Sequence, residues 1–135
     1  LSIDLDGNDY YFLNHILSNG LLPKVIICEI NGMFPPPIKF TVKYNSGHKW
    51  ARDDYQGASL ILMNELLISF GYKLIVCNAA TGVNAFFVLN EFSELFPETP
   101  SDIEEIYVEP LHINFTGFTF PRSLETILQI LKDDT

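Results

Sequence analysis

A gap of five residues separates two apolar runs in the second half of the chain, and its shortness constrains the fold strongly. The runs are Tyr72–Cys77 and Val83–Leu89, and both are rich in the β-branched and aromatic residues that favour strands. Parallel neighbours need a crossover of roughly a dozen residues or more. Because the gap at residues 78–82 is far shorter, the two runs must form an antiparallel hairpin.

The first 30 residues predict the opposite kind of pairing. Leu1–Leu5 favours a strand, residues 10–17 carry apolar side chains at helical spacing, and Pro23–Ile30 is a near-continuous apolar run. A strand, a helix and a second strand in this order form a βαβ unit with parallel strands. The β-branched composition of the second run also predicts a strand that is buried on both faces.

An insertion and a second helix lie between these two units. Residues 38–44 alternate apolar and polar side chains, which predicts a peripheral extended strand. Residues 45–57 form a polar loop that contains the only Trp, and a loop this long is more often functional than idle. Leu60–Phe70 has helical periodicity, and Gly71 ends it. The predicted order is β-α-β-(insert)-α-β-β.

The last part of the chain shows less pattern. Residues 97–121 hold four of the eight prolines and no regular periodicity. Residues 124–131 place apolar side chains at helical spacing after Ser123, which predicts a closing amphipathic helix with a serine cap. We therefore divide the chain into an α/β part at residues 1–96 and an irregular segment plus a packed helix at residues 97–135.

Composition and charge exclude several classes of protein. A chain that is 47% hydrophobic and 19% charged suits one folded domain rather than a disordered segment. The net charge of −9 argues against a nucleic-acid partner, because binding a phosphate backbone needs clustered cations. An apolar run of 18 residues is missing, so we expect no membrane span. Cys28 and Cys77 lie inside apolar runs, which favours buried thiols in a reducing, cytoplasmic compartment.

Acidic and amide side chains follow the first strand at the end where open α/β sheets bind their ligands. They are Asp4, Asp6, Asn8 and Asp9. We expect Asn8 or Asp9 to cap the following helix. Asp4 and Asp6 are candidates for function, because carboxylates one residue apart share a face of a strand and repel unless a cation lies between them.

Two further groups of residues are candidates for the same site. Glu29 and Asn31 end the neighbouring strand, and a carboxylate is rarely buried there without a partner. His48, Trp50 and Tyr55 lie in the polar loop, which would fold over these strand ends as a substrate lid. The alternative is an ordinary solvated loop that Trp50 holds in place.

Four segments resemble a known family. Ser2–Tyr10, Val25–Asn31 and Gly71–Asn78 resemble the C-terminal half of S-adenosylmethionine-dependent methyltransferases, most closely FkbM-like proteins, and Gly82–Val88 is similar to their last strand. The resemblance implies that residues 1–96 are the C-terminal half of a Rossmann-like methyltransferase sheet, with the class I strand order 4-5-7-6. It also implies S-adenosylmethionine as cofactor and O-methylation of a small molecule or sugar.

The resemblance also implies roles for individual residues. Catalysis would involve Asp4, Asp6 and Glu29, and Asp4 and Leu5 would face the cofactor. The acceptor substrate would contact Asn8, Asn31, His48, Trp50 and Tyr55. A looser similarity to metal-dependent O-methyltransferases makes Asp4, Asp6, Glu29 and Asn31 candidate ligands of Mg²⁺, which prefers oxygen donors.

The chain departs from the family where the cofactor is held. The glycine-rich turn and the acidic residue that binds the ribose belong to the N-terminal half of such enzymes. The glycines here, such as Gly7, Gly20 and Gly32, are not clustered in that way. The first strand begins at Leu1 without Met, and its outer edge carries no Pro, Lys or bulge signal. We therefore expect a longer parent chain, or a partner chain along this strand, of which a homo-oligomer is one form.

Two other functions fit parts of the sequence. A non-catalytic binding or assembly module would pair the open edge of the first strand with a partner. A haloacid-dehalogenase-like phosphatase would use the Asp-x-Asp motif of Asp4 and Asp6, although Asn8 stands where such enzymes have Thr.

Overall fold

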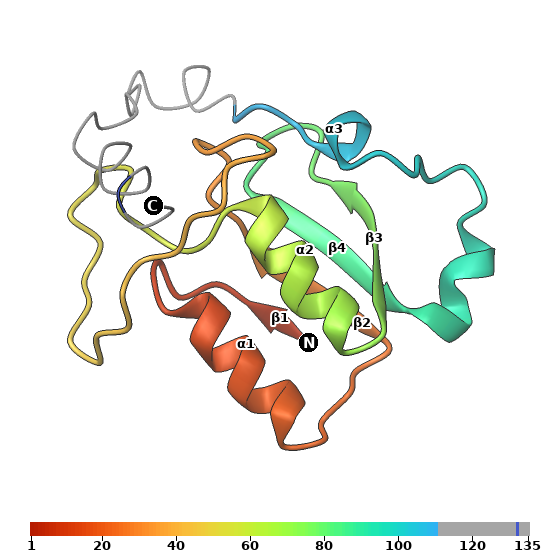
Figure 1. Cartoon of the computed structure of the whole chain (residues 1–135), viewed down its shortest axis with the longest axis horizontal. Helices are drawn as coiled ribbons and strands as arrows, with labels where there is room; N and C mark the ends of the chain where they lie inside the picture. Colours follow the sequence, from red (N-terminus) through yellow and green to blue (C-terminus); the bar gives the residue numbers. More distant parts are fainter. Residues whose placement is uncertain (111–131, 133–135) are drawn as a thin grey trace.

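A four-stranded mixed sheet forms the centre of the fold (Figure 1). The computed structural model describes residues 1–110 and Lys132. The strands are β1 (Ser2–Ile3), β2 (Val25–Glu29), β3 (Tyr72–Cys77) and β4 (Asn84–Leu89). Their order across the sheet is β1-β2-β4-β3, so the last strand within the described residues lies inside the sheet. The expected closing helix at residues 124–131 lies outside the described residues.

Two helices of ten residues each cover one face of this sheet (Figure 1). They are α1 (Asp9–Ser18) and α2 (Leu60–Ser69); the shorter helical elements are the 3₁₀ helix η1 (Asn90–Leu95) and α3 (Ile103–Ile106). The sequence predicted α1 and α2 but not η1 or α3. Among the described residues, no helix is long and apolar enough to cross a membrane.

The pairing of the strands agrees with the sequence analysis. β1 and β2 are parallel, with Ser2 opposite Ile27, and α1 connects them. β3 and β4 are antiparallel neighbours, with Tyr72 opposite Leu89, and a short turn connects them. The α/β class is therefore confirmed. The antiparallel pairing of β4 with β2, with Cys28 opposite Ala85, joins the two units into one sheet.

β2 is not buried on both faces, so that prediction was wrong. Ile26 and Cys28 are fully buried, whereas Val25 is 45% exposed and Ile27 is only partly buried. The physical reason is that α1 and α2 pack on the same face of the sheet, the face to which Ile26 and Cys28 point. The other face of β2 gains no comparable cover from these helices.

The expected strand at residues 38–44 is also wrong, because it is reduced to a single bridge between Thr41 and Ala58. Two backbone hydrogen bonds flank the bridge. The Ser59 amide donates to the Phe40 carbonyl oxygen, and the Val42 amide donates to the Gly57 carbonyl oxygen. The ladder cannot lengthen, because the partner segment enters α2 at residue 60.

β1 is shorter than the predicted strand at Leu1–Leu5. It ends at Ile3, because the Leu5 amide donates a hydrogen bond to the Asp9 carboxylate instead of continuing the ladder (2.8 Å). The strand therefore passes directly into the turn that carries the candidate site.

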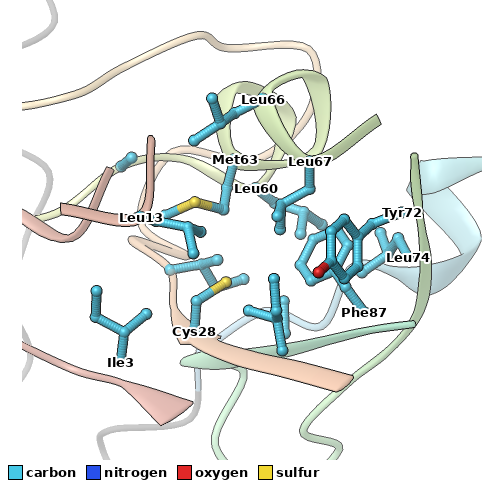
Figure 2. Close-up of a cluster of buried hydrophobic side chains, with 14 of the residues drawn as sticks. Ile3, Leu13, Cys28, Leu60, Met63, Leu66, Leu67, Tyr72, Leu74 and Phe87 are labelled. Atoms are coloured by element: carbon cyan, nitrogen blue, oxygen red, sulfur yellow. The ribbon is translucent and has the colours of Figure 1, made fainter. Parts of the chain in front are cut away.

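The hydrophobic core lies between the two helices and the sheet (Figure 2). Leu13 of α1 and Met63 of α2 point toward Cys28 and Ile3, and all four residues are buried. Phe87 from the central strand β4 is fully buried in the same cluster. Both cysteines are buried thiols, as the sequence predicted, and burial raises the pKa of Cys77 to about 11.

Replacing Phe87 by Ala should lower the free energy of unfolding by about 3–5 kcal/mol, because it removes a fully buried ring and leaves a cavity. Phe96→Ala is the matched control, because this ring is 38% exposed, and it should cost less than about 1 kcal/mol. Urea unfolding measures the free energy of unfolding of both variants, provided that their m values equal that of the original protein. Equal losses for the two variants would contradict this description of the core.

Candidate functional site

Three carboxylates meet at the carboxyl ends of β1 and β2. Because these strands are parallel, their carboxyl ends lie at the same edge of the sheet. One oxygen each from Asp4, Asp6 and Glu29 lies within 4.8 Å of the others. Asp4 and Asp6 are exposed, and Leu5 between them is 49% exposed. The structure therefore brings together the three residues predicted to be catalytic and leaves them open to a ligand.

Glu29 has the most perturbed environment of the three. Burial raises its pKa from 4.5 to about 8, and the negative charges of Asp4, Asp9 and Asp6 add to this effect. A hydrogen bond from the Asp6 backbone amide acts in the opposite direction. The Oε2 atom of Glu29 is buried without a hydrogen-bond partner among the described residues. Near neutral pH this carboxyl group can therefore both donate and accept a proton.

A buried aspartate shapes the turn that carries Asp4 and Asp6. Asp9 is fully buried, and its carboxylate accepts hydrogen bonds from the amides of Leu5 (2.8 Å) and Gly7 (3.0 Å). Burial raises the pKa of Asp9, and these hydrogen bonds lower it. The turn is tight enough to place Asp6 at a φ of 53°, in the left-handed region.

The capping expected from Asn8 or Asp9 does not occur in that form. Asn8 occupies the N-cap position of α1, but its side chain makes no capping hydrogen bond. Asp9 bonds back to the preceding turn instead of to the helix amides of residues 10–12. That prediction was wrong because both side chains form their hydrogen bonds with residues outside the helix.

The side chain of Asn8 connects the acidic turn to the polar loop. Its Nδ2 donates to the carbonyl oxygen of Asn45 (2.8 Å), and its Oδ1 accepts from the Asn45 amide (3.4 Å). The ring of His48 lies against Gly7, where an added Cβ would be 2.2 Å from His48 Cδ2. The Nε2 atom of His48 is buried and has no hydrogen-bond partner among the described residues. The loop therefore adjoins the turn that holds the carboxylates.

Trp50 and Tyr55 stabilise the loop itself. Trp50 Nε1 donates to the carbonyl oxygen of Asp53 (2.7 Å). The hydroxyl oxygen of Tyr55 accepts a hydrogen bond from the Lys43 amide (3.0 Å), and its ring centre lies 6.3 Å from that of His48. Tyr55 is 36% exposed, so part of its ring can still contact a ligand.

Asn31, which follows β2, holds the C-terminal part of the loop in place by hydrogen bonds. The residue is buried, and its Nδ2 donates to the carbonyl oxygens of Asp54 (2.8 Å) and Gln56 (2.9 Å). Its Oδ1 accepts a hydrogen bond from the Met33 amide (3.1 Å). Because both amide hydrogens are used inside the chain, Asn31 acts here by fixing the base of the loop.

Sequence reasoning missed three features of this site. It did not identify Asp9 as the residue that closes the turn, Asn45 as the partner of Asn8, or Gly7 as the space that His48 fills. Asn8 and Asn45 are 37 residues apart, and no sequence pattern links them. The one pattern that could have indicated this role of Asp9 is its position at the start of a helix, directly after Gly7 and Asn8.

The arrangement supports proton transfer and the binding of polar or cationic groups. Asp4, Asp6 and Glu29 are the one cluster of potential ligand residues found among His, Cys, Asp and Glu within residues 1–110 and Lys132. Carboxylate oxygens suit hard cations such as Mg²⁺, and they also orient hydroxyl groups. The raised pKa of Glu29 is typical of a group that exchanges protons during a reaction.

Comparisons of the chain with protein-family models, with curated proteins and with solved structures gave no match. The function therefore has to be argued from the sheet, the acidic turn and the loop. These provide a strand order, a cluster of three carboxylates and an aromatic loop beside it.

Replacing Glu29 by Gln should change how stability depends on pH. The pKa of Glu29 is higher in the folded protein (about 8) than its ordinary value of 4.5, so the folded state binds the proton more tightly. This contribution to the free energy of unfolding is fully present below about pH 4.5 and is lost as the pH rises to about 8. Glu29→Gln should therefore become progressively more stable relative to the original protein over this window.

Urea unfolding at several pH values in the presence of EDTA measures this difference. A stability difference between Glu29→Gln and the original protein that stays constant from about pH 5 to pH 8 would show that the Glu29 pKa is not raised.

Replacing Gly7 by Ala should lower the free energy of unfolding by about 1–3 kcal/mol, because the new methyl group would overlap the His48 ring. Most of this loss should disappear when His48 is also replaced by Ala, which a double-mutant cycle measures. Gly47→Ala is the control, because its nearest neighbour, Asn45 Oδ1, lies at an ordinary 3.5 Å. An unchanged cost in the His48→Ala background would mean that the two residues do not contact.

Proposed function

We propose that residues 1–96 form the C-terminal half of an S-adenosylmethionine-dependent methyltransferase of the FkbM-like kind, which methylates a hydroxyl oxygen of a small molecule or sugar. The observation that carries this proposal is the position of β4. It lies between β2 and β3 and is antiparallel to both. The class I order 4-5-7-6 inserts its last strand in the same place and the same direction, so the topology supports this half of the Rossmann-like sheet.

The two edges of the sheet differ in a way that also supports the proposal. The β3 edge has a bulge between Leu74 and Val76 and carries Lys73, and both features discourage further pairing. The β1 edge has neither feature, and its outer side has no strand partner among the described residues. β1 is only two residues long, and a further strand beside it would extend the sheet as the complete class I sheet requires.

The acidic turn supplies groups that methyl transfer to oxygen needs. Asp4 and Asp6 are exposed at the strand end, where they can orient an acceptor hydroxyl. Glu29 can take up the proton that this hydroxyl loses, because its pKa of about 8 lies close to neutral pH. S-adenosylmethionine supplies the methyl group when bound, and Asp4 and Leu5 are the exposed side chains that would face it.

The polar loop gives the site a wall. His48 and Asn45 attach it to the turn after β1, and Asn31 attaches it to the end of β2. The partly exposed rings of Trp50 and Tyr55 belong to the same loop. This placement favours a loop that contacts the acceptor and limits the access of water to it.

A non-catalytic assembly module is the second candidate, and the open edge of β1 favours it equally. Binding of S-adenosylmethionine separates the two functions. Calorimetric titration should be made with the chain alone and with the chain joined to any polypeptide encoded before Leu1. We expect binding by the joined form. Failure of both forms to bind the cofactor would favour the assembly module.

Replacing Asp4 by Asn in the form that binds the cofactor should lower kcat at least about tenfold, because the acceptor hydroxyl loses a charged partner. The affinity for S-adenosylmethionine should change much less. Glu94→Gln, an exposed residue of η1, is the control and should leave both values unchanged. An unchanged kcat in Asp4→Asn would remove this residue from the mechanism. Repeating the assay in EDTA tests whether the carboxylates act through Mg²⁺.

A further inference from the structure

A second concave site lies beside α1. It is a groove of about 410 Å³ lined by Tyr11, Phe12, His15 and Tyr44. This volume is within the range of roughly 300–1,000 Å³ that is typical of small-molecule sites. Neither Asp4, Asp6 nor Glu29 lines it, so it is distinct from the site described above.

The aromatic rings of this groove are arranged as a corner. The rings of Tyr11 and Tyr44 are 5.4 Å apart and stand at 72° to each other. The Tyr10 ring also contacts the Tyr11 ring, and the planes of the two rings are at 86° to each other. The Tyr11 hydroxyl donates a hydrogen bond to the carbonyl oxygen of Val42 (2.9 Å). Tyr11 is therefore fixed in place. The edge-to-face contact of Tyr11 with Tyr44 leaves the exposed part of Tyr44 beside a ring whose position is fixed.

Two of the lining rings remain largely open to solvent. Phe12 is 46% exposed and Tyr44 is 58% exposed, although large aromatic side chains gain free energy from burial. A ligand can reach the exposed parts of these two side chains.

The net charge of the chain and the aromatic lining of the groove favour a cation over an anion. The lining contains no Lys, Arg, Asp or Glu, and Lys43, which precedes Tyr44, is not part of it. The net charge of the chain is −9, which attracts cations and repels anions. The faces of aromatic rings carry negative electrostatic potential and attract ammonium groups, most strongly where these are poorly hydrated. Methylation of an ammonium group makes it both poorly hydrated and rounded.

We propose that the groove between Tyr11, Phe12, His15 and Tyr44 binds the quaternary ammonium group of a small molecule. The three aromatic side chains and His15 line this groove. This site is independent of the proposed methyl transfer, because it uses none of the residues assigned to that reaction.

The proposal is tested by titrating the 135-residue chain with choline while the NMR signals of its aromatic rings are recorded. The comparison ligand is the neutral analogue in which a tert-butyl group replaces the trimethylammonium group. It has almost the same shape but no charge. We expect choline to shift the ring signals and to bind at least about fivefold more tightly than the analogue. Equal binding of the two, or no binding of choline, would overturn the proposal.

Variants locate the site. Phe12→Leu and Tyr44→Leu each remove one ring from an exposed position, so both should fold and both should weaken choline binding at least about fivefold. Thermal unfolding shows whether each variant is folded. If one variant does not fold, the other is sufficient for the test. Phe96→Leu is the control, because this exposed ring is not part of the groove. Loss of binding in Phe96→Leu, or full binding in the two groove variants, would overturn the assignment.

Discussion

The antiparallel pairing of β2 with β4 is the interaction on which the rest of the structure depends. β2 pairs with β1 on one side and β4 on the other, and β4 in turn holds β3. Without this ladder the first βαβ unit and the last hairpin would be two separate fragments with no common core. Its inward residues, Cys28 and Phe87 among them, also provide the surface on which α1 and α2 pack. One ladder therefore fixes both the sheet and the core (Figures 1 and 2).

The candidate site depends on the pairing of β2 with β1, along the edge of β2 that does not pair with β4. Parallel pairing with β1 brings Glu29 to the turn after β1, where Asp9 has already replaced the ladder by side-chain hydrogen bonds. Glu29 is then partly buried beside Asp4 and Asp6, which raises its pKa to about 8. The energetic cost of gathering these carboxylates is offset by the fold, as is typical of functional sites. The aromatic groove beside α1 has no acidic residue in its lining and has a separate chemistry.

Much of the fold was predictable because it depends on local pattern and connection length. The bounds of β3 agree with the apolar run at Tyr72–Cys77, and the short connection at residues 78–83 made its antiparallel pairing with β4 unavoidable. The errors occurred where tertiary contacts decide. A continuous apolar run such as Val25–Ile30 does not show which faces helices will cover, and residues 38–44 had no pattern to show that their partner would turn into α2.

The sequence by itself determined the two long helices, the parallel pairing of β1 with β2 and the antiparallel pairing of β3 with β4, because these follow from side-chain periodicity and chain connectivity. It also placed Asp4, Asp6 and Glu29 at strand ends. Only the tertiary structure decided that the three carboxylates lie within 4.8 Å and that His48 fills the space above Gly7. These features depend on burial and on contacts between residues far apart in the chain. Such contacts form only when the sheet and the loop are packed together, and local sequence does not encode their distances.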